Sequence, residues 1–82
     1  MNIEAIWKQI LKNEGVQYLT KKGLPFTYRI EGDFVIPDRT NYPLAKAEFA
    51  KALKFMPLDG PGKISNIVRG SAYVWAILSN NR

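Results

Sequence analysis

The residues of this chain that could do chemistry are mainly its cations, because the usual catalytic side chains are missing. The 82 residues include no cysteine and no histidine. This composition excludes a thiolate nucleophile, a zinc site of the finger type and the side chain best suited to proton transfer near neutral pH. Seven carboxylates remain, and no two of them have a spacing typical of an acid and base pair. We therefore predict that the protein is not an enzyme and has no catalytic residue, metal site or cofactor.

The excess of positive charge lies in the second half of the chain. Residues 1–38 contain five basic and five acidic side chains, whereas residues 39–82 contain seven basic and two acidic ones. The whole net charge of +5 therefore belongs to the second half. A one-sided positive field attracts polyanions. This asymmetry predicts a small nucleic-acid-binding domain for DNA or RNA that contacts mainly the phosphate backbone.

Several residues of the basic half are candidates for these contacts. On an expected helix over residues 44–55, lysines project from one side with only alanines between them, although a solvated lysine-rich face has the same pattern. In the segment 39–42, arginine offers a planar fork for phosphate or a guanine edge, and tyrosine can stack on a base. Alternatively, Arg39 pairs with Asp38 or Glu31, Asn41 caps the helix and Tyr42 closes the core. The predicted nucleic-acid-binding residues are Arg39, Tyr42, Lys46, Lys51, Lys54, Lys63 and Arg69.

Two glycine-containing stretches also bear on anion binding. The spacing of Gly60-Pro61-Gly62-Lys63 does not match a P-loop, because proline and isoleucine stand where glycine and a hydroxyl residue are needed. We interpret it as an ordinary connection with one exposed lysine. Arg69-Gly70-Ser71 precedes the last expected helix, where backbone N–H groups beside a guanidinium could hold an anion, or where Ser71 simply caps the helix.

The first half of the chain predicts one helix and three strands. Apolar residues at helical spacing from Ile3 to Leu11 indicate a helix over residues 3–14, capped by Asn2 and ended by Gly15. Residues 16–20, 25–31 and 34–36 are expected strands, and Gly32-Asp33 is expected to form a type II′ turn between the last two. Alternation along 25–31 predicts one apolar face, which the first helix covers.

The second half predicts two more helices. Residues 44–55 form an amphipathic helix whose core face includes Phe49 and Ala52, with a stop at Pro57. Residues 64–69 suit a single helical turn. The segment 72–78 has no polar face, which fits either a buried helix or a central strand. Ser71 as a cap and the length of the segment favour the helix.

These elements predict one small α+β domain over residues 1–82: helix, three-stranded antiparallel β-meander, helix and C-terminal helix. The order α-β-β-β-α resembles that of double-stranded RNA-binding domains. The run of lysines after a glycine-rich turn that is typical of that family is absent here, and the strands are short. No binding residue is therefore carried over from that family.

Three stretches of the chain also resemble a pattern from short uncharacterised bacterial proteins. They are Gly23-Leu24-Pro25-Phe26-Thr27-Tyr28, Arg39-Thr40-Asn41-Tyr42 and the segment RGSAYVWAIL at residues 69–78. The resemblance implies neither an activity nor a site.

A second function class stays open beside nucleic-acid binding. Phe55 falls away from the predicted core face, and the C-terminal segment is apolar throughout. Both features suit a protein-interaction or regulatory accessory module, with an acidic partner or a second copy of the chain bound there. The sequence shows no charged leader followed by an apolar block, and no apolar run approaches the roughly 18 residues of a spanning helix. We expect a cytoplasmic protein without a membrane partner.

Overall fold

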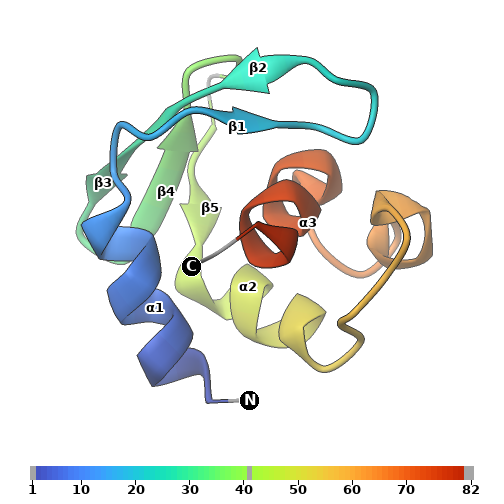
Figure 1. Ribbon diagram of the computed structural model, residues 1–82. Coiled ribbons are helices and arrows are strands. Elements are labelled where there is room, and N and C mark those ends of the chain that lie inside the picture. The colour runs from blue at the N-terminus through green and yellow to red at the C-terminus, as the bar shows by residue number, and fades with distance from the viewer. Residues whose placement is uncertain (1, 41, 81–82) are drawn as a thin grey trace.

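The computed structural model describes residues 2–40 and 42–80 and has the predicted α+β architecture. Figure 1 shows the C-terminal helix near the centre of the molecule, below a hairpin and above helix α2 (Lys46–Leu53). In chain order the elements are α1 (Ile3–Lys12), β1 (Tyr18–Leu19), β2 (Pro25–Phe26), β3 (Tyr28–Glu31), β4 (Phe34–Pro37), β5 (Leu44–Ala45), α2 (Lys46–Leu53), the 3₁₀ helix η1 (Pro61–Ile64) and α3 (Ser71–Ser79).

Helix α1 begins as predicted and ends two residues early. The side chain of Asn2 accepts a hydrogen bond from the backbone N–H of Glu4 at 2.8 Å, which satisfies one of the free donors at the helix start. Trp7 and Ile10 are buried. Leu11, which the periodicity placed on the same apolar stripe, is 41% exposed.

The hairpin between β3 and β4 confirms the predicted turn. Glu31 pairs with Phe34, which leaves Gly32 and Asp33 as a two-residue loop. Gly32 has a φ of 60°, and every described residue with positive φ is a glycine. A positive φ at the first central position alone is the type II′ geometry, whose twist matches the flanking strands.

The structure differs from the prediction in the segments that form the meander. The expected strand 25–31 splits at Thr27: β2 pairs with β1 in a separate two-stranded sheet, and β3 pairs with β4. Thr27 does not continue the ladder, because its N–H donates to the carboxylate of Asp38 at 3.1 Å and its carbonyl accepts from the N–H of Asp38 at 2.9 Å. The third strand of the meander is β5, which the pattern had placed in the following helix.

Helix α2 is shorter than predicted but buries the expected face, which includes Phe49 and Ala52. Residues 71–79 form a helix, so the strand alternative is wrong. The predicted cap is also wrong. Gly70, not Ser71, is the cap residue of α3, and it has a left-handed φ of 64°. A Cβ atom at Gly70 would lie 2.5 Å from Cδ2 of Leu44, so both the backbone angle and the packing require glycine.

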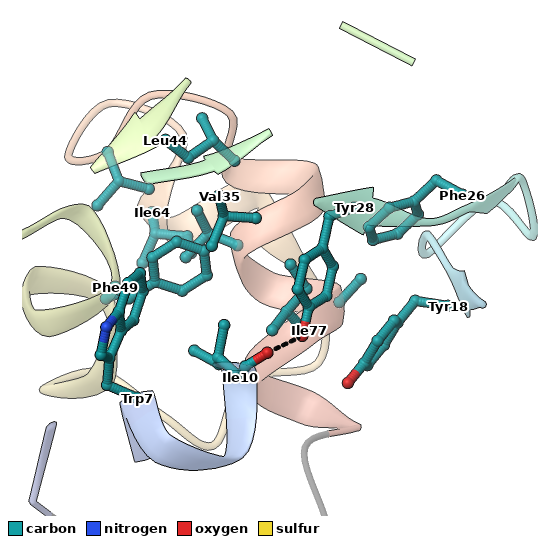
Figure 2. Close-up of a cluster of buried hydrophobic side chains, with 14 residues drawn as sticks. Trp7, Ile10, Tyr18, Phe26, Tyr28, Val35, Leu44, Phe49, Ile64 and Ile77 are labelled. Carbon is teal, nitrogen blue, oxygen red and sulfur yellow. Dashed lines mark hydrogen bonds between the residues drawn. The ribbon is translucent and has the colours of Figure 1, made fainter. Parts of the chain in front are cut away.

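The core joins all three helices to both sheets (Figure 2). The Tyr28 hydroxyl donates to the carbonyl of Ile10 at 2.6 Å and so ties β3 to the end of α1. This contact agrees with the prediction that the first helix covers the apolar face of the sheet. Of the two tryptophans, Trp7 is buried, whereas Trp75 is only partly buried and packs against the core.

Candidate nucleic-acid interface

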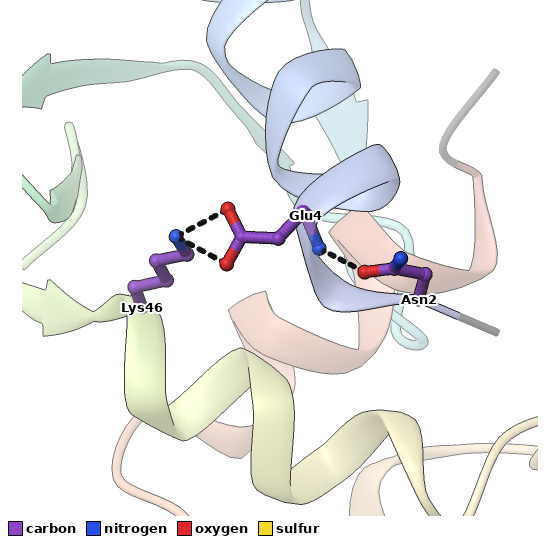
Figure 3. A network of polar contacts seen from close by, with 3 residues as sticks. All are labelled: Asn2, Glu4 and Lys46. Atoms are coloured by element: carbon purple, nitrogen blue, oxygen red, sulfur yellow. Dashed lines mark hydrogen bonds and ion pairs between the residues drawn. The ribbon is translucent and has the colours of Figure 1, made fainter.

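The lysines of α2 do not form one continuous basic face. Lys46, the first residue of α2, extends toward α1, where its Nζ lies 2.9 Å from both carboxylate oxygens of Glu4 (Figure 3). The same ammonium group lies 5.8 Å from the ring centroid of Trp7. Lys46 therefore connects two helices, and its charge is balanced by Glu4.

Lys51 pairs with a different carboxylate, that of Glu48 one turn earlier on α2. Its Nζ lies 2.7 Å from Oε2 of Glu48, while Oε1 accepts the backbone N–H of Arg69 at 3.0 Å. The hydrogen bond from Lys51 and then the one from the Arg69 backbone hold the pKa of Glu48 below its ordinary value. The ionised Glu48 thus ties the segment before α3 to the surface of α2.

Arg69 extends from this anchored backbone over an aromatic ring. Its guanidinium carbon lies 5.0 Å from the ring centroid of Tyr42, a distance typical of a cation–π contact. Both residues are exposed, and Tyr42 is 38% exposed, so it does not close the core. We call Tyr42, Glu48, Lys51 and Arg69 the Arg69 cluster. It brings together three of the residues predicted to bind nucleic acid.

The remaining arginine of the predicted set, Arg39, lies outside this cluster. It is exposed, and its Nη1 lies 3.5 Å from the carbonyl of Pro25, at the limit of a hydrogen bond. Neither of its expected acidic partners binds it: Glu31 pairs with Arg29 at 2.9 Å, and Asp38 accepts the N–H of Thr27. The predicted cap Asn41 lies outside the described residues.

Two predicted lysines lie elsewhere. Lys54 is the C-terminal cap residue of α2, is exposed, and lines a cavity between α1 and α2. Lys63 in η1 lines an open cavity of about 510 Å³ together with Lys21, which is not among the residues predicted to bind nucleic acid. Lys21 donates to the carbonyl of Asp59 at 2.6 Å, 38 residues away. No local spacing predicts a contact between residues so far apart. The one feature of the sequence that draws attention to Lys21 is its position in a pair of adjacent lysines, Lys21-Lys22.

Comparisons with protein-family models, with curated proteins and with solved structures found no match to this chain. Within residues 2–40 and 42–80, the acidic side chains form no group of three or more that could hold a metal ion. None of the helices in that part of the chain is long and apolar enough to cross a bilayer. The Arg69 cluster is the largest convergence of predicted site residues, so its geometry carries the functional argument.

Proposed function

We propose that the protein binds nucleic acid through the Arg69 cluster. The observation that carries the proposal is the exposed ring of Tyr42, with the guanidinium carbon of Arg69 at 5.0 Å from its centroid and Lys51 held nearby through Glu48. An aromatic ring beside cations can stack a base while the cations contact the adjoining phosphates. Among the residues described, this is the place where an aromatic side chain and two predicted phosphate ligands meet.

The exposed ring favours single-stranded DNA or RNA over a duplex. In a duplex the base faces are stacked on one another, whereas in a single strand they are free to stack on a side chain. The proposal therefore favours a single-stranded ligand, and both DNA and RNA remain candidates. Contacts to phosphates would supply most of the affinity, as expected from the charge of the basic half.

Glu48 has a positioning role in this proposal. It reduces the local positive charge, but it also fixes the ammonium group of Lys51 and the backbone of Arg69 by hydrogen bonds of 2.7 and 3.0 Å. Groups that are ordered before the ligand arrives lose less conformational entropy on binding. By holding these two cationic residues in place, the carboxylate compensates for part of the affinity that is lost when it neutralises positive charge.

The test is a titration of fluorescent 15-residue dT and rU oligonucleotides, and of a duplex of the same length, at a low and a physiological salt concentration. We expect the affinity for single strands to fall with added salt, because phosphate contacts release counterions. Removing the base-stacking ring in Tyr42→Ala, or the guanidinium in Arg69→Ala, should each weaken binding about tenfold.

The matched control is Arg29→Ala. Arg29 is also exposed and also close to a carboxylate, at 2.9 Å from Glu31, but it lies outside the cluster. The Arg29→Ala variant should have only slightly lower affinity for the oligonucleotide, because it loses one unit of net charge. The proposal fails if no binding is detected at low salt, if affinity is independent of salt, or if Arg29→Ala weakens binding as much as Arg69→Ala does.

A cytoplasmic location, predicted above from the sequence, is part of the same proposal. Nucleic acids accessible to a small binding domain are present in that compartment. Cell fractionation with an antibody against the chain would test the location. Recovery only in a membrane or extracellular fraction would contradict it.

A further inference from the structure

A groove lined mainly by apolar side chains crosses the ends of all three helices and shares no residue with the Arg69 cluster. Two cavities of about 480 and 530 Å³ share Leu53 and Met56 and so adjoin each other. Helix α1 contributes Ile3 and Ile6, and α3 contributes Trp75 and Leu78. These six residues are partly buried, so they complete the core on one side and offer apolar surface on the other.

The wall formed by α3 is held in place. The indole Nε1 of Trp75 donates to the carbonyl of Leu58 at 2.9 Å, which fixes the ring where it borders the groove. Leu58 lines the same cavity. Because the only polar atom of the indole ring is satisfied within the chain, the exposed part of the ring can contact an apolar ligand without leaving a polar atom unpaired.

The charge on the groove lining is positive. Lys54 is the one charged residue that lines either cavity in the described part of the chain. On another side of the groove wall, the ammonium group of Lys21 lies 5.9 Å from the ring centroid of Trp75. A ligand that is apolar at its centre and acidic at its edge complements this arrangement. A second copy of a chain with a net charge of +5 would be repelled by it.

The backbone of the ligand must satisfy its own hydrogen bonds. The residues that line the groove come from helices and the connection after α2, so no strand edge borders it. An extended peptide laid on these apolar side chains would lose hydrogen bonds to water without replacement. A helix has no such loss. A helix of about 14 residues is about 21 Å long, close to the shortest dimension of the molecule, 22 Å.

We propose that this groove binds an amphipathic helix of another protein, with apolar residues along one face and a carboxylate placed opposite Lys54. Recognition of this kind uses apolar anchors spaced along one side of the helix, and the flanking charge sets its orientation. The groove shares no residue with the Arg69 cluster, so, resting on the function proposed above, the chain would join a protein partner to a nucleic acid. Phe55, 48% exposed beside Lys54, can extend the contact beyond the groove.

The probe is a synthetic 14-residue helical peptide with leucine anchors at helical spacing and glutamates at one flank. It is compared with the same peptide carrying lysines in place of the glutamates. Chemical shifts of the ¹⁵N-labelled protein and its tryptophan fluorescence, to which Trp75 contributes beside Trp7, would report binding. We expect saturable binding of the acidic peptide, with shifts at residues of α2 and α3 that line the groove, and at least fivefold weaker binding of the basic peptide.

Two variants locate the site. Lys54→Glu changes an exposed side chain and leaves the core intact, so it should weaken the acidic peptide about fivefold and strengthen the basic one. Met56→Glu places a charge in the groove itself and should weaken the acidic peptide at least tenfold. The matched control, Leu24→Glu, changes an apolar residue that is 46% exposed elsewhere on the surface and should have little effect.

Several outcomes would overturn the proposal. They are the absence of saturable binding, equal binding of the acidic and basic peptides, insensitivity to Lys54→Glu, or shifts that lie outside the groove. A concentration-dependent dimer in sedimentation that excludes the peptide would also overturn it, because a second copy would then be the occupant. Arg69→Ala should leave peptide binding unchanged, which separates this proposal from the nucleic-acid one.

Discussion

Glu4 and Glu48 each hold a lysine of α2, yet the two contacts have different consequences. Glu4 binds Lys46 across the seam between α1 and α2, where the ammonium group also faces the ring of Trp7. Glu48 binds Lys51 on the same helix and uses its second oxygen to anchor the backbone of Arg69. One carboxylate joins two helices, and the other supports a segment whose cationic side chain faces solvent.

The difference shows how packing sorts residues of one type into separate roles. Lys46 and Lys51 are five residues apart on one short helix. Their partners are decided by which element lies against each turn of that helix. Lys46 lies against helix α1 and pairs with Glu4 there. Lys51 lies near the segment before α3, where the guanidinium of Arg69 and the ring of Tyr42 are exposed.

The largest expected effect concerns the backbone that carries Arg69. Gly70→Ala combines a side chain at a φ of 64° with a Cβ placed 2.5 Å from Cδ2 of the buried Leu44. We expect a loss of about 3 kcal/mol in the free energy of unfolding, measured by urea denaturation. Gly23→Ala is the matched control, since its φ is 83° but nothing lies within 4 Å. It should cost about 1 kcal/mol, and equal losses would show that the contact with Leu44 is unimportant.

The next effect concerns the carboxylate of the cluster. Glu48→Gln should lower the free energy of unfolding by about 1–2 kcal/mol near neutral pH, because charged hydrogen bonds to Lys51 and Arg69 are weakened. The pKa of Glu48 is lowered from its ordinary 4.5, so its contribution is present above pH 4.5 and is lost as the pH falls below that value. Denaturation from neutral to acidic pH should show the two proteins converging in acid. A difference in the free energy of unfolding that does not change with pH would contradict this role of the Glu48 carboxylate.

Helix α1 also makes a buried contact with strand β3. Tyr28→Phe removes the hydroxyl that donates to the carbonyl of Ile10 and should cost about 1 kcal/mol. Burial, and then the neighbouring Tyr18, raise the pKa of Tyr28 far above its ordinary 10.0. The folded state therefore loses stability relative to the unfolded chain as the pH rises above 10.0, because the unfolded tyrosine ionises first. Alkaline denaturation should be shallower in Tyr28→Phe; an unchanged slope would contradict this.

The smallest effect is expected at the surface pair of the seam. Lys46→Met keeps the stem of the side chain over Trp7 and removes its charge, and it should cost about 0.5 kcal/mol, less at high salt. In Arg29→Ala, whose pair is about 60% exposed on both sides, the cost should be close to zero. A loss for Lys46→Met larger than that for Glu48→Gln would reverse the comparison between the two carboxylates.

Local patterns predicted the elements whose formation depends on their own residues. The apolar spacing from Ile3 to Ile10 predicted α1, and Gly32-Asp33 predicted the hairpin, because turn geometry and side-chain period are set within a few residues. The apolar segment 72–78 left helix and strand open, since a fully buried element has no polar face to reveal its period. The structure decided for the helix.

The candidate site was predicted less well than the fold. Tyr42, Lys51 and Arg69 were on the predicted list, but nothing in their spacing showed that they meet, or that Glu48 joins two of them. The ion pair of Lys46 with Glu4 joins residues that are 42 positions apart in the sequence. The split of the strand at Thr27 depends on Asp38, a residue 11 positions later. Each of these contacts forms only after distant segments have packed.

By itself, the sequence determined the α+β class, the start of α1, the turn of the hairpin, most of the buried faces of α1 and α2, and the placement of all net charge in one half. These properties depend on residue type and on spacing of a few positions. The tertiary structure alone decided which cations are balanced, which stand beside an exposed ring, and where the three helix ends leave an apolar groove. The reason is that a side chain's partner is set by the element packed against it, and that element is generally far away along the chain.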